Sequence, residues 1–189
     1  MRRPADSGSK LGLSAGFTLI ELLITITVAA VIMGIAVPSF VDFVVKNRLK
    51  TQASELRLTL ASARVEAIRR GMRVVVCPWN GIDTLAGAKC TTAAEWANGW
   101  FSFADADMDG TYDANEETLE RHAALEGGDL LTGPDKFVFR SDGTVVDSGS
   151  MTLCSSDTDY KDDARAIKIS NVGRVRVLLQ PFPLGVTKC

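Results

Sequence analysis

A twelve-residue segment in the middle of the chain has acidic side chains at the spacing of a calcium-binding loop. It reads DADMDGTYDANE, residues 105–116. Alternate carboxylates, a glycine for the sharp turn and a final glutamate can surround Ca²⁺ with six or seven oxygens. The expected ligands are Asp105, Asp107, Asp109, Glu116 and, through its carbonyl oxygen, Thr111. A strand-like run rather than a helix precedes the loop, so a plain acidic turn between strands is the alternative interpretation.

A second cluster of charged side chains lies near the C-terminus and is basic. Residues 164–189 contain no acid and five cations: Arg165, Lys168, Arg174, Arg176 and Lys188. Arg174 and Arg176 share one face if this run is a strand, and Gly173 permits a turn that presents them outward. Two guanidinium groups about 7 Å apart can each bind a phosphate. The alternative is that these arginines pair with acids of the same chain or of a neighbouring one.

The residues that nucleophilic or metal-dependent enzymes use are scarce. His122 is the single histidine, and we interpret it as a solvated or packed residue of an amphipathic strand. No glycine-rich phosphate loop occurs, and Trp79, Trp96 and Trp100 are interpreted as core or sheet packing. We therefore expect that the protein is not an enzyme.

Cysteines suggest an oxidising compartment. Their number is even, and all four lie after the predicted helix: Cys77, Cys90, Cys154 and Cys189. Without CxxC spacing or further histidines a zinc site is disfavoured, and two disulfides are expected. The spacing itself leaves three pairings open.

Charge is distributed unevenly along the 189 residues, although the net charge is only −2. Residues 1–16 carry a net charge of +2 and residues 46–73 a net charge of +6, whereas residues 74–189 carry −8. The chain is therefore a basic front attached to an acidic body, and the overall balance excludes a polybasic protein.

One apolar segment is long enough to cross a membrane. Residues 17–37 read FTLIELLITITVAAVIMGIAV, close to the about 20 residues that a membrane-spanning helix needs. The basic residues before it favour a cytoplasmic N-terminus, which places the body on the other side. Glu21 is anomalous, because a carboxylate at membrane depth costs about 2.5–3.5 kcal/mol on insertion scales. The segment can carry this acid, and snorkelling to the membrane surface is the alternative to a functional role.

The helical pattern continues beyond Pro38. Its apolar positions are four and three residues apart, the spacing of one helix face: Leu49, Ala53, Leu56, Leu60, Ala63 and Ala67. With Gly71 as its C-cap, the sequence predicts one helix from Phe17 to Arg70. We expect its basic face to meet acidic neighbours or phospholipid headgroups rather than nucleic acid.

After the helix the sequence is typical of short strands. The expected strands are residues 73–77, 99–103, 118–122, 136–140, 144–146, 151–154, 166–170 and 174–179. Residues 157–163 are expected to form a polar loop. One long helix and mainly antiparallel strands predict an α+β fold.

The start of the apolar segment carries a family resemblance. Gly16-Phe17-Thr18-Leu19-Ile20-Glu21, followed by an unbroken apolar run, resembles the processing site of type IV pilins and type II secretion pseudopilins. The resemblance implies that a prepilin peptidase cleaves after Gly16 and that the new amine of Phe17 is methylated. It also implies a pilin-like fold, with residues 1–16 as leader, 17–37 as transmembrane and filament-core helix, 38–71 as amphipathic helix and 72–189 as head.

The same resemblance suggests a role for the anomalous glutamate. Glu21 of one subunit can pair with the positive amine of Phe17 on a neighbour inside the apolar filament, where each charge alone would be expensive. In this family the helix around Pro38 melts on assembly, and Gly34 and Pro38 suit that behaviour.

Further motifs make the body similar to the GspH/FimT/FimU group. These are Gly99-Trp100 before the acidic loop, KFVFRSDGT from residue 136, and ISNVGRVRV from residue 169. The resemblance implies a Cys154–Cys189 disulfide, which leaves Cys77–Cys90; Cys90–Cys154 is the alternative. Gly173-Arg174-Val175-Arg176 resembles a GRxR motif with which FimT-type minor pilins hold DNA, and Lys168 and Lys188 would support it.

These expectations define a structural protein. The favoured function is a minor pilin that joins a type IV pilus, helps to initiate its assembly, and binds DNA for uptake in natural transformation; the alternative is a type II secretion pseudopilin of the H type. The implied partners are minor and major pilins, prepilin peptidase, the inner-membrane assembly platform and extracellular DNA. The implied location is the bacterial inner membrane, with a periplasmic body, and then the pilus.

Overall fold

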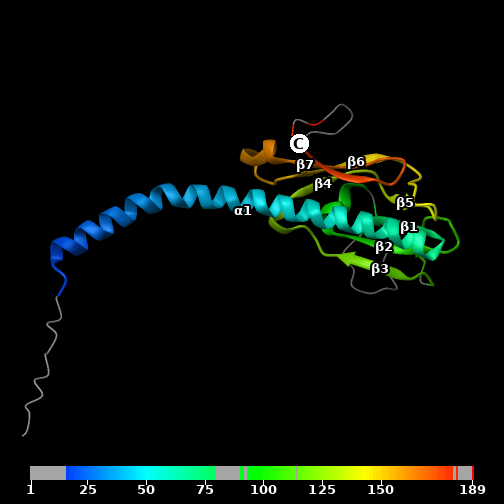
Figure 1. The fold of residues 1–189 in the computed structure, drawn as a ribbon, viewed down its shortest axis with the longest axis horizontal. Helices are drawn as coiled ribbons and strands as arrows, with labels where there is room; N and C mark the ends of the chain where they lie inside the picture. The colour runs from blue at the N-terminus through cyan, green and yellow to red at the C-terminus, as the bar shows by residue number, and fades with distance from the viewer. Residues whose placement is uncertain (1–15, 80–89, 92, 114, 181, 183–188) are drawn as a thin grey trace, which may run out of the picture. The chain divides into compact units, whose positions relative to one another are not determined.

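The computed structural model of the protein describes residues 16–79, 90–91, 93–113, 115–180, 182 and 189. The chain divides into two compact units, Met1–Val41 and Asp42–Cys189. Figure 1 labels the helices and strands. Residues 1–15 of the expected leader and Lys188 lie outside the described residues.

Helix α1 (Leu19–Arg70) begins and ends with recognisable caps. The Thr18 hydroxyl accepts a hydrogen bond from the Glu21 amide (3.3 Å), as an N-cap does. At the other end Gly71 has a φ of 68°, and its amide donates to the Ala67 carbonyl (3.0 Å). The helix therefore starts two residues later than expected and ends at the expected arginine, and its backbone stays helical through Pro38.

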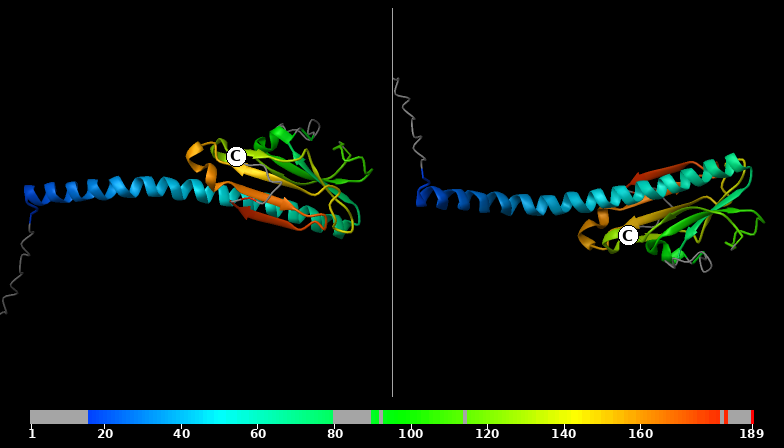
Figure 2. Two further views of the ribbon diagram at one scale, coloured as in Figure 1. Left: turned by 90° about the horizontal axis from the view of Figure 1, so that it is seen from above. Right: turned by 90° about the horizontal axis from the view of Figure 1, so that it is seen from below.

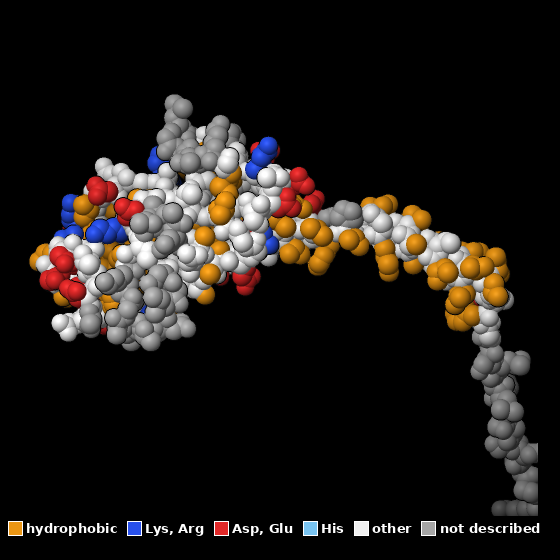
Figure 3. Space-filling model, turned by 180° about the vertical axis from the view of Figure 1, so that it is seen from behind, with side chains coloured by type: hydrophobic (Ala, Val, Ile, Leu, Met, Phe, Trp, Pro, Cys, Tyr) orange, Lys and Arg blue, Asp and Glu red, His pale blue; other side chains and the backbone are white. Residues whose placement is uncertain are grey.

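The first unit contains the apolar part of α1. By length and composition α1 is the one helix in the described chain that could cross a membrane. Its large apolar side chains are exposed, from Phe17 to Val37, and Figure 3 shows them gathered along this segment. The Thr25 and Thr27 hydroxyls donate to carbonyls of the preceding turn. These polar groups therefore find partners inside the helix, as a lipid environment requires.

The second unit contains two four-stranded antiparallel sheets. The first has the order β3-β2-β1-β5 and the second β4-β6-β7-β8. Their strands are β1 (Arg73–Pro78), β2 (Trp100–Asp105), β3 (Thr118–His122), β4 (Leu130–Thr132), β5 (Phe137–Phe139), β6 (Gly149–Cys154), β7 (Arg165–Ile169) and β8 (Val175–Leu179). Short 3₁₀ helices η2 (Ala93–Asn98), η3 (Glu126–Gly128) and η4 (Thr158–Asp163) lie between strands. The α+β class with antiparallel pairing is confirmed.

The second half of α1 supplies one wall of the core. All six residues of the predicted stripe, from Leu49 to Ala67, are buried, and they share one hydrophobic cluster with residues of both sheets. Figures 1 and 2 show this part of α1 crossing the two sheets. Burial of a leucine side chain contributes about 1.5–3 kcal/mol, so this stripe anchors the head to the helix.

The strand predictions were wrong at two places. Residues 144–146 were expected to form a strand, but they make a single bridge, Phe139 to Val145, and the Val145 amide donates to the Asn171 carbonyl (3.0 Å). Strand β4 was not expected. It has only three residues, and its pairing with β6 is a tertiary contact that local pattern does not encode. The predicted polar loop 157–163 contains η4.

Candidate functional site

The N-terminal motif is fully exposed at the start of α1. Gly16 and Phe17 precede the helix, Thr18 caps it, and Glu21 lies in its first turn. A carboxylate at this position is favoured by the positive end of the helix dipole. The geometry leaves the bond between Gly16 and Phe17 accessible and keeps Glu21 within one helical turn of it.

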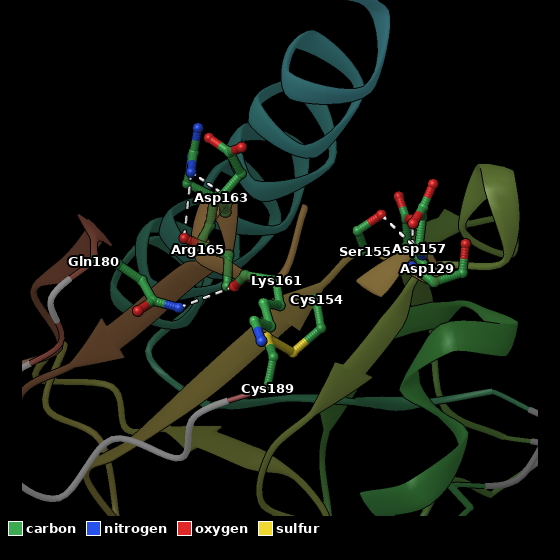
Figure 4. The surroundings of a disulfide bond; sticks show 11 residues. Asp129, Cys154, Ser155, Asp157, Lys161, Asp163, Arg165, Gln180 and Cys189 are labelled. Atoms are coloured by element: carbon green, nitrogen blue, oxygen red, sulfur yellow. Dashed lines mark hydrogen bonds between the residues drawn. A yellow bond between two sulfur atoms is a disulfide. The ribbon is translucent and has the colours of Figure 1, made fainter. Parts of the chain in front are cut away.

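Two disulfides join the four cysteines. Cys77 in β1 is bonded to Cys90, and Cys154 at the end of β6 is bonded to Cys189; their Cα atoms are 5.4 and 5.7 Å apart. Figure 4 shows the second bond, which ties the C-terminus to β6 beside η4. The pairing implied by the resemblance is confirmed, and the alternative Cys90–Cys154 is excluded. All cysteines are oxidised, so no thiolate is present.

A cationic surface lies on the last two strands. Lys168 of β7 and Arg176 of β8 are directly opposite each other in the antiparallel register. Arg174 immediately precedes β8, and all three side chains are exposed. Together with Ser170, Val172 and Leu178 they line a groove of about 480 Å³. We call Lys168, Arg174 and Arg176 the β7–β8 cationic surface.

The turn before this surface requires glycine. Gly173 has a φ of 71°, and its amide donates to the Ser170 carbonyl (2.8 Å). A Cβ atom here would overlap the Gly143 carbonyl oxygen. The Ser170 amide in turn donates to the Arg174 carbonyl (3.1 Å), so the turn fixes where β8 starts and which face Arg174 occupies.

The cations of this surface have no acidic partner within the part of the chain that the structure describes. The ion pairs there involve other basic residues: Lys46, Arg48, Arg69, Arg70, Arg73 and His122. The alternative prediction, that Arg174 and Arg176 form ion pairs with acids of the same chain, is therefore wrong for the acids that the structure describes. Three exposed guanidinium or ammonium groups remain available to an anionic partner.

A second cationic groove lies on the helix side of β8, which the sequence reasoning did not single out. It measures about 450 Å³ and is lined by Lys50, Ser54, Arg57, Arg165, Val177 and Leu179. The basic run of residues 46–73 was visible in the sequence, but it did not predict this groove. Only the packing of α1 beside β8 brings Lys50 and Arg57 next to Arg165. Elsewhere the basic face of α1 meets acids as expected, with Lys46 to Asp163 at 3.4 Å and Arg48 to Asp129 at 2.8 Å.

The acidic loop connects β2 to β3. Asp105 ends β2 and is buried, whereas Asp107 and Asp109 are exposed, and one carboxylate oxygen of each lies within 4.8 Å of the others. Both Glu116 oxygens accept backbone hydrogen bonds, from the Ala106 amide (2.9 Å) and the Asp113 amide (3.1 Å). Burial raises the pKa of Glu116, and the charges of Asp105 and Asp107 add to that increase. The structure thus brings the three aspartates together and holds Glu116 close enough to interact with the charges of Asp105 and Asp107.

The histidine and tryptophans have packing roles. The His122 ring stacks on Trp100 at 4.9 Å, and its Nε2 lies 3.1 Å from Glu120 Oε1. Trp96 and Trp100 are in the main core. Trp79 belongs to a smaller cluster and carries the Arg121 guanidinium over its ring at 5.4 Å. This confirms the interpretation of these aromatic residues as core or sheet packing.

Comparison with known proteins agrees with this geometry. Residues 52–173 match the family described as "Type II transport protein GspH", and residues 13–37 match the "Prokaryotic N-terminal methylation motif". The type IV minor pilin FimU of Pseudomonas aeruginosa (strain PAO1) is 21% identical, with a TM-score of 0.53 over 74% of this chain and 92% of that chain. The minor pseudopilin EpsH of the Vibrio cholerae type 2 secretion system is 14% identical, with a TM-score of 0.48 over 71% of this chain and 99% of that chain.

The FimU likeness shows that the fold is that of pilin-like proteins, with a long N-terminal helix packed on antiparallel sheets. The family is one of structural pilins and pseudopilins rather than of enzymes. The family match covers more than half of the sequence and includes most of the helix stripe and strands β1 to β7, and it ends at Gly173 in the β7–β8 turn. The methylation motif, the fold and this match together show that the chain belongs to the GspH family of minor pilins and pseudopilins.

Proposed function

We propose that the chain is a minor pilin of a type IV pilus that helps to initiate pilus assembly and binds DNA for uptake through its β7–β8 cationic surface. The single observation that carries the DNA role is that Lys168, Arg174 and Arg176 are exposed together, without an ion-pair partner among the described residues. Phosphate contacts of this kind are independent of sequence and depend on salt. Lys188 is proposed as a supporting cation from the sequence alone.

The proposed maturation uses the N-terminal motif. Prepilin peptidase removes residues 1–16 by cleavage between Gly16 and Phe17, and the Phe17 amine is methylated. The exposed Gly16-Phe17 bond and the methylation-motif match over residues 13–37 support this step. Mass spectrometry of the purified protein tests it, because the mature chain begins with a methylated Phe17.

The proposed membrane topology follows from the same segment. Residues 17–37 cross the bacterial inner membrane once, residues 38–71 form the amphipathic half of the helix, and the head, residues 72–189, lies in the periplasm before it enters the pilus. The exposed apolar side chains of the first unit and the two disulfides support this arrangement. The assembly platform of the inner membrane then transfers the protein into the filament.

In the proposed filament Glu21 pairs with the Phe17 amine of a neighbouring subunit, either another minor pilin or the major pilin. The pair compensates two charges that would otherwise be buried alone in an apolar core. Pro38 lacks the amide hydrogen that a helix uses, so local melting near it costs little during this transition.

A deletion strain separates the proposed roles. We expect deletion to reduce pilus number and DNA uptake, and complementation with Arg174→Gln/Arg176→Gln to restore pili but not uptake. Arg69→Gln/Arg140→Gln removes the same charge from exposed positions outside the surface and should restore both. Full DNA uptake with the first double variant would contradict the DNA role and leave the assembly role intact.

A type II secretion pseudopilin of the H type is the second candidate, because the matching family is described as a type II transport protein. This function predicts that deletion blocks release of secreted enzymes while pilus number and twitching motility stay normal. The same deletion strain therefore distinguishes the two systems by its exoprotein release.

A further inference from the structure

We propose that four acidic residues at the end of β2 and between β2 and β3, namely Asp105, Asp107, Asp109 and Glu116, form a calcium site, with the Thr111 carbonyl oxygen as a further ligand. This inference is independent of the filament and of DNA. It adds a metal site to a head whose other candidate surfaces are cationic.

The first argument is the convergence of three carboxylates. One oxygen each of Asp105, Asp107 and Asp109 lies within 4.8 Å of the other two. Calcium binds oxygen at 2.3–2.6 Å, so two ligands on opposite sides of the ion are about 5 Å apart. The three oxygens are therefore close enough together to approach one ion.

The second argument is the burial of Asp105. Its side chain is 0% exposed, and its Oδ1 accepts a hydrogen bond from the Gly110 amide at 3.1 Å. Its Oδ2 is buried and accepts no hydrogen bond among the described residues. A buried carboxylate oxygen without a donor costs free energy, and a bound cation removes that cost.

Arg73 does not fully replace such a cation. Its Nε lies 3.4 Å from Asp105 Oδ2 but makes no hydrogen bond in the described chain, and its Nη1 donates to the Met108 carbonyl (2.6 Å) instead. Arg73 therefore compensates part of the Asp105 charge from one side and fixes the loop backbone. Asp107 and Asp109 contribute two further exposed negative charges to the same cluster.

Two residues of the loop have a left-handed backbone conformation. Met108 and Gly110 have φ angles of 65° and 73°, and Met108 is the one described non-glycine residue with a positive φ. Tyr112 turns inward and packs edge-on against Phe101 and Phe103, each at 5.2 Å. The glycine at the sixth position and the buried aromatic at the eighth hold the ligand-bearing residues in place.

Glu116 completes the proposed ligand set. The Ala106 and Asp113 amides donate to its two carboxylate oxygens, at 2.9 and 3.1 Å, and hold the carboxylate beside the loop. A divalent cation there would offset the repulsion between this carboxylate and the aspartates. Because Asp105 ends β2 and Glu116 lies two residues before β3, the ion would also join two paired strands, of which β3 is at the sheet edge.

The test uses the full chain in detergent micelles, titrated with CaCl₂ or with MgCl₂ at equal ionic strength. At a calcium concentration about a hundred times the dissociation constant we expect the melting temperature to rise by about 5–10 °C. We expect the β3 amides to gain protection from hydrogen exchange. Magnesium should produce a much smaller shift, because it dehydrates reluctantly and needs stricter geometry.

Matched variants assign the effect to the loop. Asp107→Asn, Asp109→Asn and Glu116→Gln should each reduce the calcium-induced shift by more than half. Asp147→Asn removes the same charge from an exposed position outside the loop and should keep the shift. The proposal is overturned if 5 mM calcium does not raise the melting temperature, if magnesium acts equally, or if the loop variants respond like the wild type.

Discussion

An ion pair with a buried carboxylate links the second half of α1 to the sheets. Arg48 donates to both oxygens of Asp129, at 2.9 and 2.8 Å, and the Asp129 side chain is 0% exposed. Arg48→Met should lower the free energy of unfolding by about 3 kcal/mol, because it leaves a buried carboxylate without its cation. Chemical denaturation of the full chain measures this loss. Arg69→Met, which removes an exposed ion pair, should cost less than about 1 kcal/mol, and equal losses would contradict the prediction.

A second residue-scale prediction concerns acid stability. Hydrogen bonds from Arg69 and Arg70 lower the pKa of Glu66 from 4.5 to about 2. Because the folded-state pKa is depressed, this contribution to stability is present above pH 4.5 and is lost as the pH falls toward 2. Glu66→Gln should therefore flatten the dependence of melting temperature on pH within that window. The comparison with wild type at pH 7 and pH 3 checks it, and an unchanged pH profile would show that Glu66 does not contribute.

At the scale of elements, the stripe of α1 decides the position of the helix on the sheets. Leu56 is 1% exposed, whereas Leu58, two residues away on the same helix, is 56% exposed. Leu56→Ala should lower the free energy of unfolding by about 2–5 kcal/mol, from lost burial and the remaining cavity. Leu58→Ala has the same chemistry and should change it by less than about 0.5 kcal/mol. Urea denaturation measures both losses. Similar losses for the two variants would contradict the prediction that the face of α1 with Leu56 packs on the sheets.

Element packing also explains how β8 acquires its two cationic grooves. As an edge strand it has β7 on one side, and its alternating residues line different grooves: Arg174, Arg176 and Leu178 on one, Val177 and Leu179 on the other. Successive side chains of a strand point to opposite faces of the sheet, so neighbouring residues of β8 line different grooves. The arginines of the motif thus stay exposed, while Val175 and Val177 contact the core.

For the whole molecule, DNA binding should follow counterion release. If Lys168, Arg174 and Arg176 each contact one phosphate, the logarithm of the affinity of the full chain for duplex DNA should fall with the logarithm of salt concentration with a slope of about −3. Arg174→Gln/Arg176→Gln should bring that slope to about −1 and weaken binding at low salt. A fluorescence titration at several salt concentrations gives both values. An unchanged slope in the double variant would place the contact elsewhere.

Assembly is the other whole-molecule property. Glu21→Ala removes the carboxylate that pairs with the Phe17 amine in the proposed filament, while the apolar length that inserts into the membrane is unchanged. We expect the variant to fractionate with membranes at the wild-type level and to be depleted from sheared pili. Glu21→Asp, a matched variant that keeps the charge, should be depleted less. Wild-type amounts of Glu21→Ala in pili would contradict the pairing.

The sequence by itself determined the long helix, its buried stripe, its C-cap and most strands. These features are local, since periodicities of 3.6 and 2 residues and a glycine at a helix end follow from nearby residues. The motif around Gly16 and Glu21 also identified the family without any knowledge of the tertiary structure, because the processing site is read as linear sequence. The acidic loop was visible for the same reason, as twelve consecutive residues.

Tertiary structure alone decided what depends on residues far apart in the chain. Strand β4 forms because β6 lies beside it, and Asp129 is buried with Arg48, 81 residues earlier. The sequence left both the disulfides and the partners of Arg174 and Arg176 open between alternatives. Packing joins Cys154 to Cys189 and separates those arginines from the described acids. Such contacts depend on how two sheets fold over one helix, and no local pattern records that geometry.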